Sequence, residues 1–214
     1  MRVLVTGANR GIGKGLVAAF ASRGGDVTGT ARHAGAGTLV LDVTDPASVR
    51  AMAAAFGDAP LDLLVCNAGV YVDKGEDIGS GYPATAWAET FAVNVTGVFM
   101  TVQALLPNLR AAPGKIAIIA SAMASDSRAP GGSLIYRASK AAALNLGRNL
   151  AADLRGDGIA VGIYHPGWVR TDMGGGGANI DIADAAAGLI SRFDALSAAT
   201  SGCFEDWKGD AVPF

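Results

Sequence analysis

The chain has 214 residues, half of them hydrophobic and 17% charged, which is the composition of an ordinary globular chain and not of a disordered one. That length predicts one domain, residues 1–214, large enough to bury a core without disulfides or metals. The formal net charge of -2 argues against nucleic acid as the main partner.

Only two cysteines occur, Cys66 and Cys203, and they lie far apart in the sequence. We expect Cys66, inside an apolar run, to be a core residue, and the low cysteine content fits a reducing cytoplasm. The first apolar residues, Val3 to Val5, are too few for a secretory signal. Because we find no apolar run long enough to span a bilayer, we expect a cytoplasmic protein without a membrane partner.

Short apolar runs alternate with longer helical stretches along the chain. The runs predict strands at Arg2–Val5, Asp26–Ala31, Thr38–Leu41, Leu61–Cys66, Lys115–Ala120, Ile159–Tyr164 and Cys203–Phe204. The longer stretches predict helices at Ile12–Ser22, Ala47–Phe56, Ala84–Leu109, Leu134–Leu154 and Ala183–Leu196. This alternation predicts an α/β fold, a single doubly wound domain with a mostly parallel seven-stranded sheet and helices on both faces. We expect flexible stretches at Asp73–Pro83 and Gly174–Gly177.

Most residues with useful chemistry follow the carboxyl ends of the predicted strands. In doubly wound sheets, ligands bind beyond those ends. The segments concerned are Thr6–Gly13, Arg32, Asp42, Asn67–Gly69, Ser121 and His165–Thr171. We therefore expect one binding site along this edge of the sheet.

A glycine-rich loop joins the first predicted strand to the first predicted helix. Gly7, Gly11 and Gly13 have the spacing G-x-x-x-G-x-G. Glycine permits a tight turn and lets a ligand phosphate approach the backbone closely. The helix that follows offers free amides and the positive end of its dipole. The loop therefore predicts a dinucleotide-binding site.

With this spacing the chain resembles the short-chain dehydrogenase/reductase family, whose opening motif is T-G-x-x-x-G-x-G. The resemblance covers essentially the whole chain, through Asp42-Val43, Asn67-Ala68-Gly69, Asn94, Ser121, the Y-x-x-x-K motif from Tyr136 to Lys140, and Pro166-Gly167. Cys66 stands where the family commonly has a further asparagine. The chain also looks like the C-factor (C-signal) subgroup in Tyr136–Ala142, Gly167–Met173 and its short ending Gly202–Phe214.

The resemblance implies a single NAD(P)-binding Rossmann domain and catalysis by Asn94, Ser121, Tyr136 and Lys140. In the family's mechanism Tyr136 is the acid/base, and Lys140 lowers its pKa and binds the nicotinamide ribose. Ser121 orients the substrate oxygen, and Asn94 holds a water that passes protons to Lys140. The implied cofactor-binding residues are Gly7, Asn9, Arg10, Gly11, Ile12, Gly13, Arg32, Asp42, Val43, Asn67, Ala68, Gly69, Tyr136, Lys140, Pro166, Gly167, Val169 and Thr171. We expect no metal site, because no His or Cys lies at ligand spacing.

The pairing of Tyr136 with Lys140 has a physical reason. The oxygen left by hydride transfer to a carbonyl needs a proton donor beside it. An isolated tyrosine, with a pKa near ~10, needs about 4 kcal/mol to titrate near neutrality. A cation ~4 Å away supplies roughly that amount at an effective dielectric of ~20. Lys140 lies four residues after Tyr136 and therefore shares its helix face.

The serine assignment leaves an alternative open. Ser121 and Tyr136 are two residues further apart than is commonest in the family, and the usual distance falls on Met123, which has no hydroxyl. We choose Ser121, because it closes an apolar strand, and we keep Ser125 as the alternative.

The second predicted strand ends in Ala31 and Arg32. Ala31 stands where an acid would accept the ribose hydroxyls of NAD. Arg32, with Arg10 in the glycine loop, suits the 2′-phosphate of NADP, because a guanidinium binds phosphate through a fork of N–H donors. We expect NADP(H) to be preferred, with NAD(H) as the second option.

The sequence predicts an NADP(H)-dependent oxidoreductase that acts on a small-molecule carbonyl or secondary alcohol. The alternative is a dinucleotide-binding signalling or regulatory protein of the C-factor type with vestigial activity. A lyase or epimerase of the family is a third candidate, but such enzymes usually carry a longer substrate region. By resemblance we expect a homodimer or homotetramer. Candidate substrate-wall residues are Val70, Tyr71, Met123, Trp168 and Met173.

Overall fold

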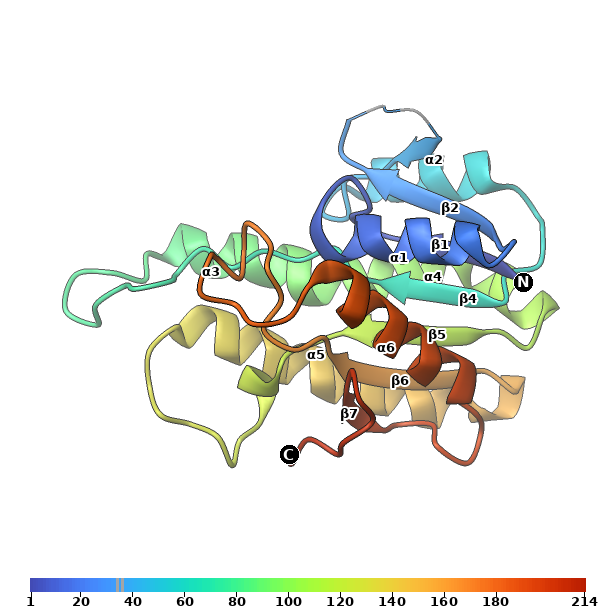
Figure 1. Ribbon diagram of the computed structural model, residues 1–214. Coiled ribbons are helices and arrows are strands. Elements are labelled where there is room, and N and C mark those ends of the chain that lie inside the picture. Colours follow the sequence, from blue (N-terminus) through green and yellow to red (C-terminus); the bar gives the residue numbers. More distant parts are fainter. Residues whose placement is uncertain (34, 36) are drawn as a thin grey trace.

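Seven short strands form one sheet in the computed structural model, which describes residues 1–33, 35 and 37–214. The strands are β1 Arg2–Val5, β2 Asp26–Ala31, β3 Thr38–Val40, β4 Leu63–Cys66, β5 Lys115–Ile119, β6 Ala160–His165 and β7 Phe204–Asp206. They lie in the order β3-β2-β1-β4-β5-β6-β7, and each neighbouring pair is parallel. The predicted doubly wound sheet is confirmed, and its parallel pairing extends to β7 (Figure 1).

Helices connect the strands and return the chain to the same end of the sheet. The α-helices are α1 Gly11–Ser22, α2 Pro46–Phe56, α3 Ala84–Phe91, α4 Gly97–Ala111, α5 Leu134–Asp153 and α6 Ile182–Ala195. Three shorter turns were not predicted: the π-helical η1 Ala92–Thr96 and the 3-10 turns η2 Ala122–Ala124 and η3 Arg155–Asp157. Most predicted boundaries are within a residue or two of these. The start of β4 at Leu63 rather than Leu61 has a local cause, because the Leu61 amide donates to the carbonyl of Asn108 in α4.

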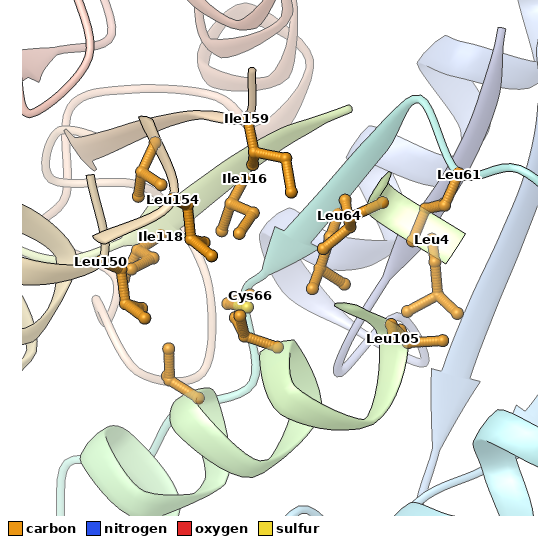
Figure 2. Packing of buried hydrophobic residues seen from close by; sticks show 14 of the residues in the cluster. Leu4, Leu61, Leu64, Cys66, Leu105, Ile116, Ile118, Leu150, Leu154 and Ile159 are labelled. Atoms are coloured by element: carbon orange, nitrogen blue, oxygen red, sulfur yellow. The ribbon is translucent and has the colours of Figure 1, made fainter. Parts of the chain in front are cut away.

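The two faces of the sheet carry separate apolar clusters, because side chains alternate along each strand. Val3 and Val5 pack with α1 and α6 on one face. Leu4, between them, packs with α2, α4 and α5 on the other face, where Figure 2 shows it beside Leu64 and Leu105. Cys66 lies buried in this second cluster, and burial raises the pKa of its thiol to about 12. It is therefore the core residue that the sequence predicts.

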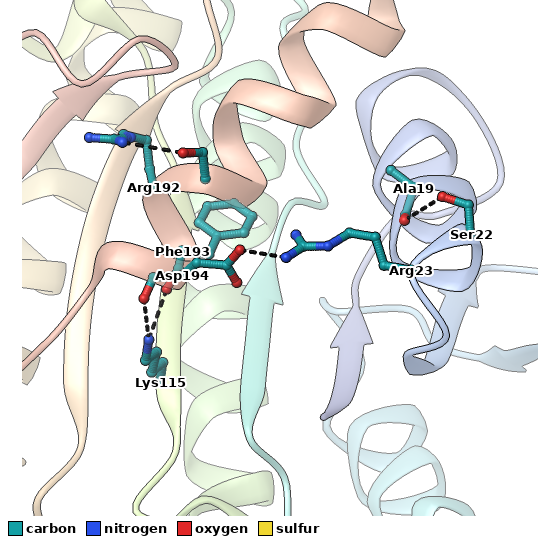
Figure 3. Close-up of polar contacts among 8 residues, drawn as sticks. Ala19, Ser22, Arg23, Lys115, Arg192, Phe193 and Asp194 are labelled. Atoms are coloured by element: carbon teal, nitrogen blue, oxygen red, sulfur yellow. Dashed lines mark hydrogen bonds and ion pairs between the residues drawn. The ribbon is translucent and has the colours of Figure 1, made fainter.

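Polar contacts fix α1 and α6 to each other and to the sheet. Arg23 at the end of α1 forms an ion pair with Asp194 in α6, at 2.7 Å. Lys115, at the start of β5, donates to the carbonyls of Phe193 and Asp194 at 3.0 and 2.9 Å (Figure 3). A cation at a helix C-terminus satisfies carbonyls that have no partner within the helix.

The elements α3, η1 and α4 run together as one helix over Ala84–Ala111, with a mean hydropathy of 1.4 in its most apolar stretch. By length and composition this helix could cross a membrane, so the expectation that no apolar run is long enough was wrong. The same composition is typical of a helix that covers a parallel sheet. This helix covers the sheet, since α4 contacts β4 and β5 as well as α2. Its hydropathy is therefore only weak evidence for a membrane partner.

Helix α5 approaches the sheet closely at Gly147. A Cβ on this glycine would lie 2.6 Å from Ile163 of β6 and 3.0 Å from Ile118 of β5. The absence of a side chain there lets the helix backbone rest directly on the strand side chains. Because α5 also carries Tyr136 and Lys140, this contact sets how deeply both residues lie.

We predict that Gly147→Ala destabilises the fold by about 1–3 kcal/mol, because the added methyl overpacks the contact between α5 and the sheet. Urea unfolding measures the change. The matched control is Gly156→Ala, whose Cβ would meet nothing within 4 Å and which we expect to be neutral or to stabilise by up to about 1 kcal/mol. Equal midpoints for the two variants would contradict this account of α5.

Candidate active site

The glycine loop folds tightly against the end of β4. Gly7 has a φ of 66°, and a Cβ there would lie 2.9 Å from the Ala68 Cα. A Cβ on Gly13 would lie 2.3 Å from the Gly7 carbonyl oxygen and 2.5 Å from the Asn67 Nδ2. The Asn67 amide closes the arrangement by donating to the carbonyls of Thr6 and Gly7 at 2.9 and 3.1 Å. Glycine is therefore required at both positions by close approach of the backbone.

The N-terminus of α1 is open to a ligand. Arg10 occupies the N-cap position, its side chain does not cap the helix, and the first turn carries no acidic residue. The first amides and the positive end of the dipole therefore face outward, which favours an anion. Gly11 and Ile12 line a cavity of about 130 Å³ there, together with Asn67 and Gly69. The cradle fits a dinucleotide pyrophosphate, because only glycine lets phosphate oxygens come this close to the backbone.

A second, larger cavity of about 440 Å³ adjoins the first. The two share Ile12, Ala120, Tyr136, Pro166, Thr171 and Met173. Of the candidate substrate-wall residues, Tyr71, Met123, Trp168 and Met173 line the larger cavity, whereas Val70 lines neither. Lys74 and His165, which are not among the predicted site residues, also line the larger cavity.

Tyr136 lies at the junction of the two cavities and is 7% exposed. Burial raises the pKa of its phenol to about 12, against the effect of the Ser121 hydroxyl, which lowers it. The ring of Tyr71 stacks on the Tyr136 ring, with centroids 4.2 Å apart. Tyr136 therefore stays protonated near neutral pH and can donate a hydrogen bond to an oxygen in the larger cavity.

Lys140 lies beneath Tyr136, with its Nζ 5.7 Å from the centre of the Tyr136 ring. It is 5% exposed and donates to the Ile119 carbonyl at 2.9 Å. Burial lowers its pKa to about 8, so the ammonium form prevails near neutral pH. Phenol and ammonium therefore lie on one face of α5 as predicted, but the expected lowering of the Tyr136 pKa is not seen, because burial raises that pKa instead.

The two candidate serines have different surroundings. Ser121 lines the larger cavity and begins η2, where its Oγ accepts from the Met123 amide at 3.1 Å. Ser125 lines neither cavity and is 3% exposed, with its Oγ 2.9 Å from the Ser127 Oγ. The geometry brings Ser121 to Tyr136 and leaves Ser125 aside.

Asn94 occupies the π-helical turn η1 and is 1% exposed. Its Nδ2 donates to the Val70 carbonyl and to the Ser139 Oγ, both at 3.0 Å, and its Oδ1 accepts from the Val70 amide at 2.9 Å. The side chain thus fixes the backbone that follows β4. A Cβ on Gly69 would lie 3.3 Å from the Asn94 Oδ1 and 3.5 Å from the Lys140 Nζ, so both polar groups flank the same glycine.

The segment after β6 forms the far wall of both cavities. Pro166 and Thr171 line both, and Gly167 and Val169 line the larger one. The Thr171 Oγ1 accepts from the Gly174 amide at 3.1 Å. These four predicted cofactor-binding residues therefore meet the glycine loop across the cleft.

Four other predicted cofactor-binding residues are less enclosed. Asn9, Arg32, Asp42 and Val43 line neither cavity. Asp42 accepts from the Thr44 hydroxyl and amide, which lowers its carboxyl pKa, and the nearby Arg32 guanidinium contributes less. Val43 is buried, and a Cβ on Gly97 would lie 2.8 Å from it.

Arg10, the second predicted phosphate-binding arginine, forms an ion pair with Asp172 at 2.8 Å. The pair crosses the smaller cavity, which both residues line. Asp172, 162 residues further along the chain, is therefore the partner of this arginine in the cleft.

Asp73 was assigned to a flexible loop, and the structure places it differently. It is 1% exposed, and its carboxylate accepts from the Ile135 amide at 2.8 Å.

Among the residues described, no three His, Cys, Asp or Glu side chains gather where they could hold a metal ion.

Comparisons with known proteins agree with this geometry. The short chain dehydrogenase family model matches residues 1–177. The C-signal of Myxococcus xanthus is 37% identical over 169 residues, which cover 78% of this chain and 100% of that protein. The 1-hydroxy-2-glutathionyl-2-methyl-3-butene dehydrogenase of Rhodococcus sp. strain AD45 is 35% identical over 223 residues, covering 97% of this chain and 96% of that protein.

Solved structures agree as well. The NADPH-bound carbonyl reductase from chicken fatty liver is 31% identical, with a TM-score of 0.91 over 100% of this chain and 98% of that one. The likeness extends over the strands and helices that carry both cavities.

We predict that Gly13→Ala weakens NADPH binding by about 10- to 100-fold, because a Cβ that must displace the Gly7 carbonyl costs about 1–3 kcal/mol. Titration of the nicotinamide fluorescence measures the affinity. Gly156→Ala, which adds the same methyl in open space, is the control. An unchanged affinity for Gly13→Ala would show that the loop does not hold the dinucleotide.

Proposed function

The chain belongs to the short-chain dehydrogenase family and is an oxidoreductase, and on this basis we propose that it reduces carbonyls or oxidises secondary alcohols with NADP(H), using Tyr136 as acid/base. The observation that carries the proposal is the burial of Tyr136 and Lys140 together, at the point where the cleft beside the glycine loop meets the larger cavity. The larger cavity is the proposed substrate site.

Each polar side chain has a role that follows from its position. Reduced nicotinamide, when bound, supplies the hydride that reaches the carbonyl carbon. The Tyr136 phenol, protonated because its pKa is raised to about 12, donates the proton to the carbonyl oxygen. Ser121, which lines the same cavity, orients that oxygen.

Lys140 acts on the phenolate that remains after proton donation. With a pKa of about 8, its ammonium is charged near neutral pH and stabilises the phenolate electrostatically. Asn94 acts through the Val70 backbone that it holds and, as the resemblance implies, through a water that passes protons to Lys140. The chain contains all four catalytic residues that the family resemblance implies, Asn94, Ser121, Tyr136 and Lys140.

Two arginines support the choice of NADP(H). Ala31, the last residue of β2, stands where an acid would serve NAD, and Arg32 follows it. Arg10 occupies the N-cap position of α1. Both are exposed and can reach a 2′-phosphate, whose charge suits a guanidinium. The proposed dinucleotide contacts are the loop glycines, Asn67 to Gly69 and the Pro166–Thr171 wall.

The signalling or regulatory alternative is not favoured. It draws on the similarity to the C-signal, but loss of a catalytic side chain, which would support it, has not occurred. We propose further that the chain is cytoplasmic and forms a homodimer or homotetramer, as the family resemblance implies.

We predict that Tyr136→Phe lowers kcat for carbonyl reduction by about 10²- to 10⁴-fold, because the variant has no proton donor at the carbonyl oxygen. A panel of aliphatic and aromatic aldehydes and ketones, followed by NADPH absorbance, measures the rate. The variant should still bind NADPH. The control is Tyr82→Phe, which removes a hydroxyl outside both cavities. If wild type and Tyr136→Phe both bind NADPH and neither reduces any carbonyl, the regulatory alternative holds.

We predict that Arg32→Ala raises the KM for NADPH by about 10- to 100-fold, the loss expected for a hydrogen bond to a charged phosphate, and leaves the KM for NADH nearly unchanged. Steady-state kinetics with each cofactor measure both values. Arg155→Ala removes the same charge from η3 at the other end of the sheet and controls for net charge. A wild-type preference for NADH, with Arg32→Ala harmless to NADPH use, would refute the assignment.

A further inference from the structure

The first turn of α5 lacks a local cap, although it carries Tyr136. Ser133 is the N-cap residue, but its φ of 50° and ψ of 45° place it in the left-handed region, and its side chain caps no amide. The first amides of a helix have no partner within the helix. When they are buried, an unsatisfied amide is costly, so the acceptor must come from elsewhere in the chain.

Asp73 supplies that acceptor from the segment that follows β4. Its Oδ2 accepts from the Ile135 amide at 2.8 Å, and both carboxylate oxygens lie 3.3 Å from the Tyr136 amide. Asp73 is 1% exposed, so a charge is buried for this purpose. In the extended conformation of an ordinary N-cap, a serine side chain would satisfy such an amide without burying a charge, but the left-handed Ser133 does not.

The same segment holds the Tyr136 side chain. The Tyr71 ring stacks on the Tyr136 ring with an interplanar angle of 19°, and the Tyr71 hydroxyl is hydrogen-bonded to the Ser133 Oγ. Its neighbour Val70 is fixed at both backbone atoms by Asn94. A short run after β4 therefore contacts Tyr136 at its backbone amide and at its ring.

We propose that Asp73 is a positioning residue, whose buried carboxylate holds the first turn of α5 and thereby keeps the Tyr136 phenol at the junction of the two cavities. The inference rests on the proposed role of Tyr136 as acid/base and deepens it. Asp73 touches the Tyr136 backbone and acts on the reaction through Tyr136. Tyr71 assists by covering one face of the phenol ring.

The negative charge of Asp73 acts on the Tyr136 pKa, an effect that an uncharged cap would not have. The groups that act on the phenol are Asp73 and Tyr71 from this segment, Ser121 before η2, and Lys140 from α5 itself. The other titratable side chains that line the two cavities with Tyr136 are Lys74, His165, Arg10 and Asp172. Burial is the main cause of the raised Tyr136 pKa; Ser121 lowers this pKa, and Tyr71 and, to the smallest extent, Asp73 raise it. Removing the negative charge at position 73 stabilises the phenolate, so the Tyr136 pKa must fall.

The test compares Asp73→Asn, which keeps the shape and one acceptor oxygen, with Asp73→Ala, which removes both. Oxidation of a panel of secondary alcohols with NADP⁺ needs the phenolate, so kcat rises with pH as Tyr136 loses its proton. We expect Asp73→Asn to move this rise to lower pH. We expect Asp73→Ala to lower kcat by about 10- to 100-fold, the size of loss that a misplaced catalytic group causes, with the KM for NADP⁺ unchanged. Asp73→Asn should recover part of this loss.

Asp45→Ala is the matched control, because Asp45 caps α2 by accepting from the Ala47 amide at 2.8 Å and lines neither cavity. It should lower the stability against urea without changing kcat or the pH dependence. If Asp73→Asn has the pH dependence of wild type, or if Asp73→Ala keeps the wild-type kcat, the proposal is overturned.

A second measurement needs no turnover and separates this inference from the proposed function. Ultraviolet absorbance of tyrosinate, taken as the difference between each protein and its Tyr136→Phe counterpart, reports the titration of Tyr136 alone. A lower Tyr136 pKa in Asp73→Asn supports the placement of the carboxylate even if the wild type reduces no carbonyl. An unchanged pKa refutes that placement even if the wild type is an active reductase.

Discussion

The contact on which the site depends is the close approach of α5 to the sheet at Gly147. Because no Cβ separates the helix from Ile163 and Ile118, the face of α5 that includes Lys140 and Tyr136 lies deep against the strand ends. Burial there shifts the two pKa values in opposite directions, to about 12 for the phenol and about 8 for the ammonium. A Cβ at position 147 would meet both isoleucines, so the helix could keep this depth only if they shifted.

The fold and much of the candidate site could be predicted because they depend on local patterns. Continuous apolar runs mark strands buried on both faces, and parallel connection brings every carboxyl end to one edge. Tyr136 and Lys140 meet because four residues make one helical turn. The serine could not be settled by counting, since the interval to Tyr136 holds the η2 turn and a loop. Ser121 reaches the cavity because it lies two residues after the end of β5, whatever the length of that loop.

The features that sequence reasoning missed are contacts between distant parts of the chain. Asp73 lies 62 residues before the amide that it caps, and Arg10 lies 162 residues before its partner Asp172. Neither pairing has a local periodicity. The π-helical turn at Asn94 was missed for a related reason, because its side chain is drawn to the Val70 backbone and the helix accommodates this with one wider turn. A composition of apolar helix formers gives no sign of such a widening.

In the ion pair between Arg10 and Asp172, the Asp172 carboxylate competes with ligand anions for the Arg10 guanidinium. Any anion that binds the Arg10 guanidinium must displace a carboxylate attached to the opposite wall. Because this carboxylate belongs to the same chain, its effective concentration does not fall when the protein is diluted. The pair is exposed on both sides, so displacing it costs at most about 1 kcal/mol. That is enough to discount small free anions, which gain a single contact, while a ligand that also fills the amides of α1 loses little. The ion pair therefore weighs more against an anion with one contact than against a ligand with several.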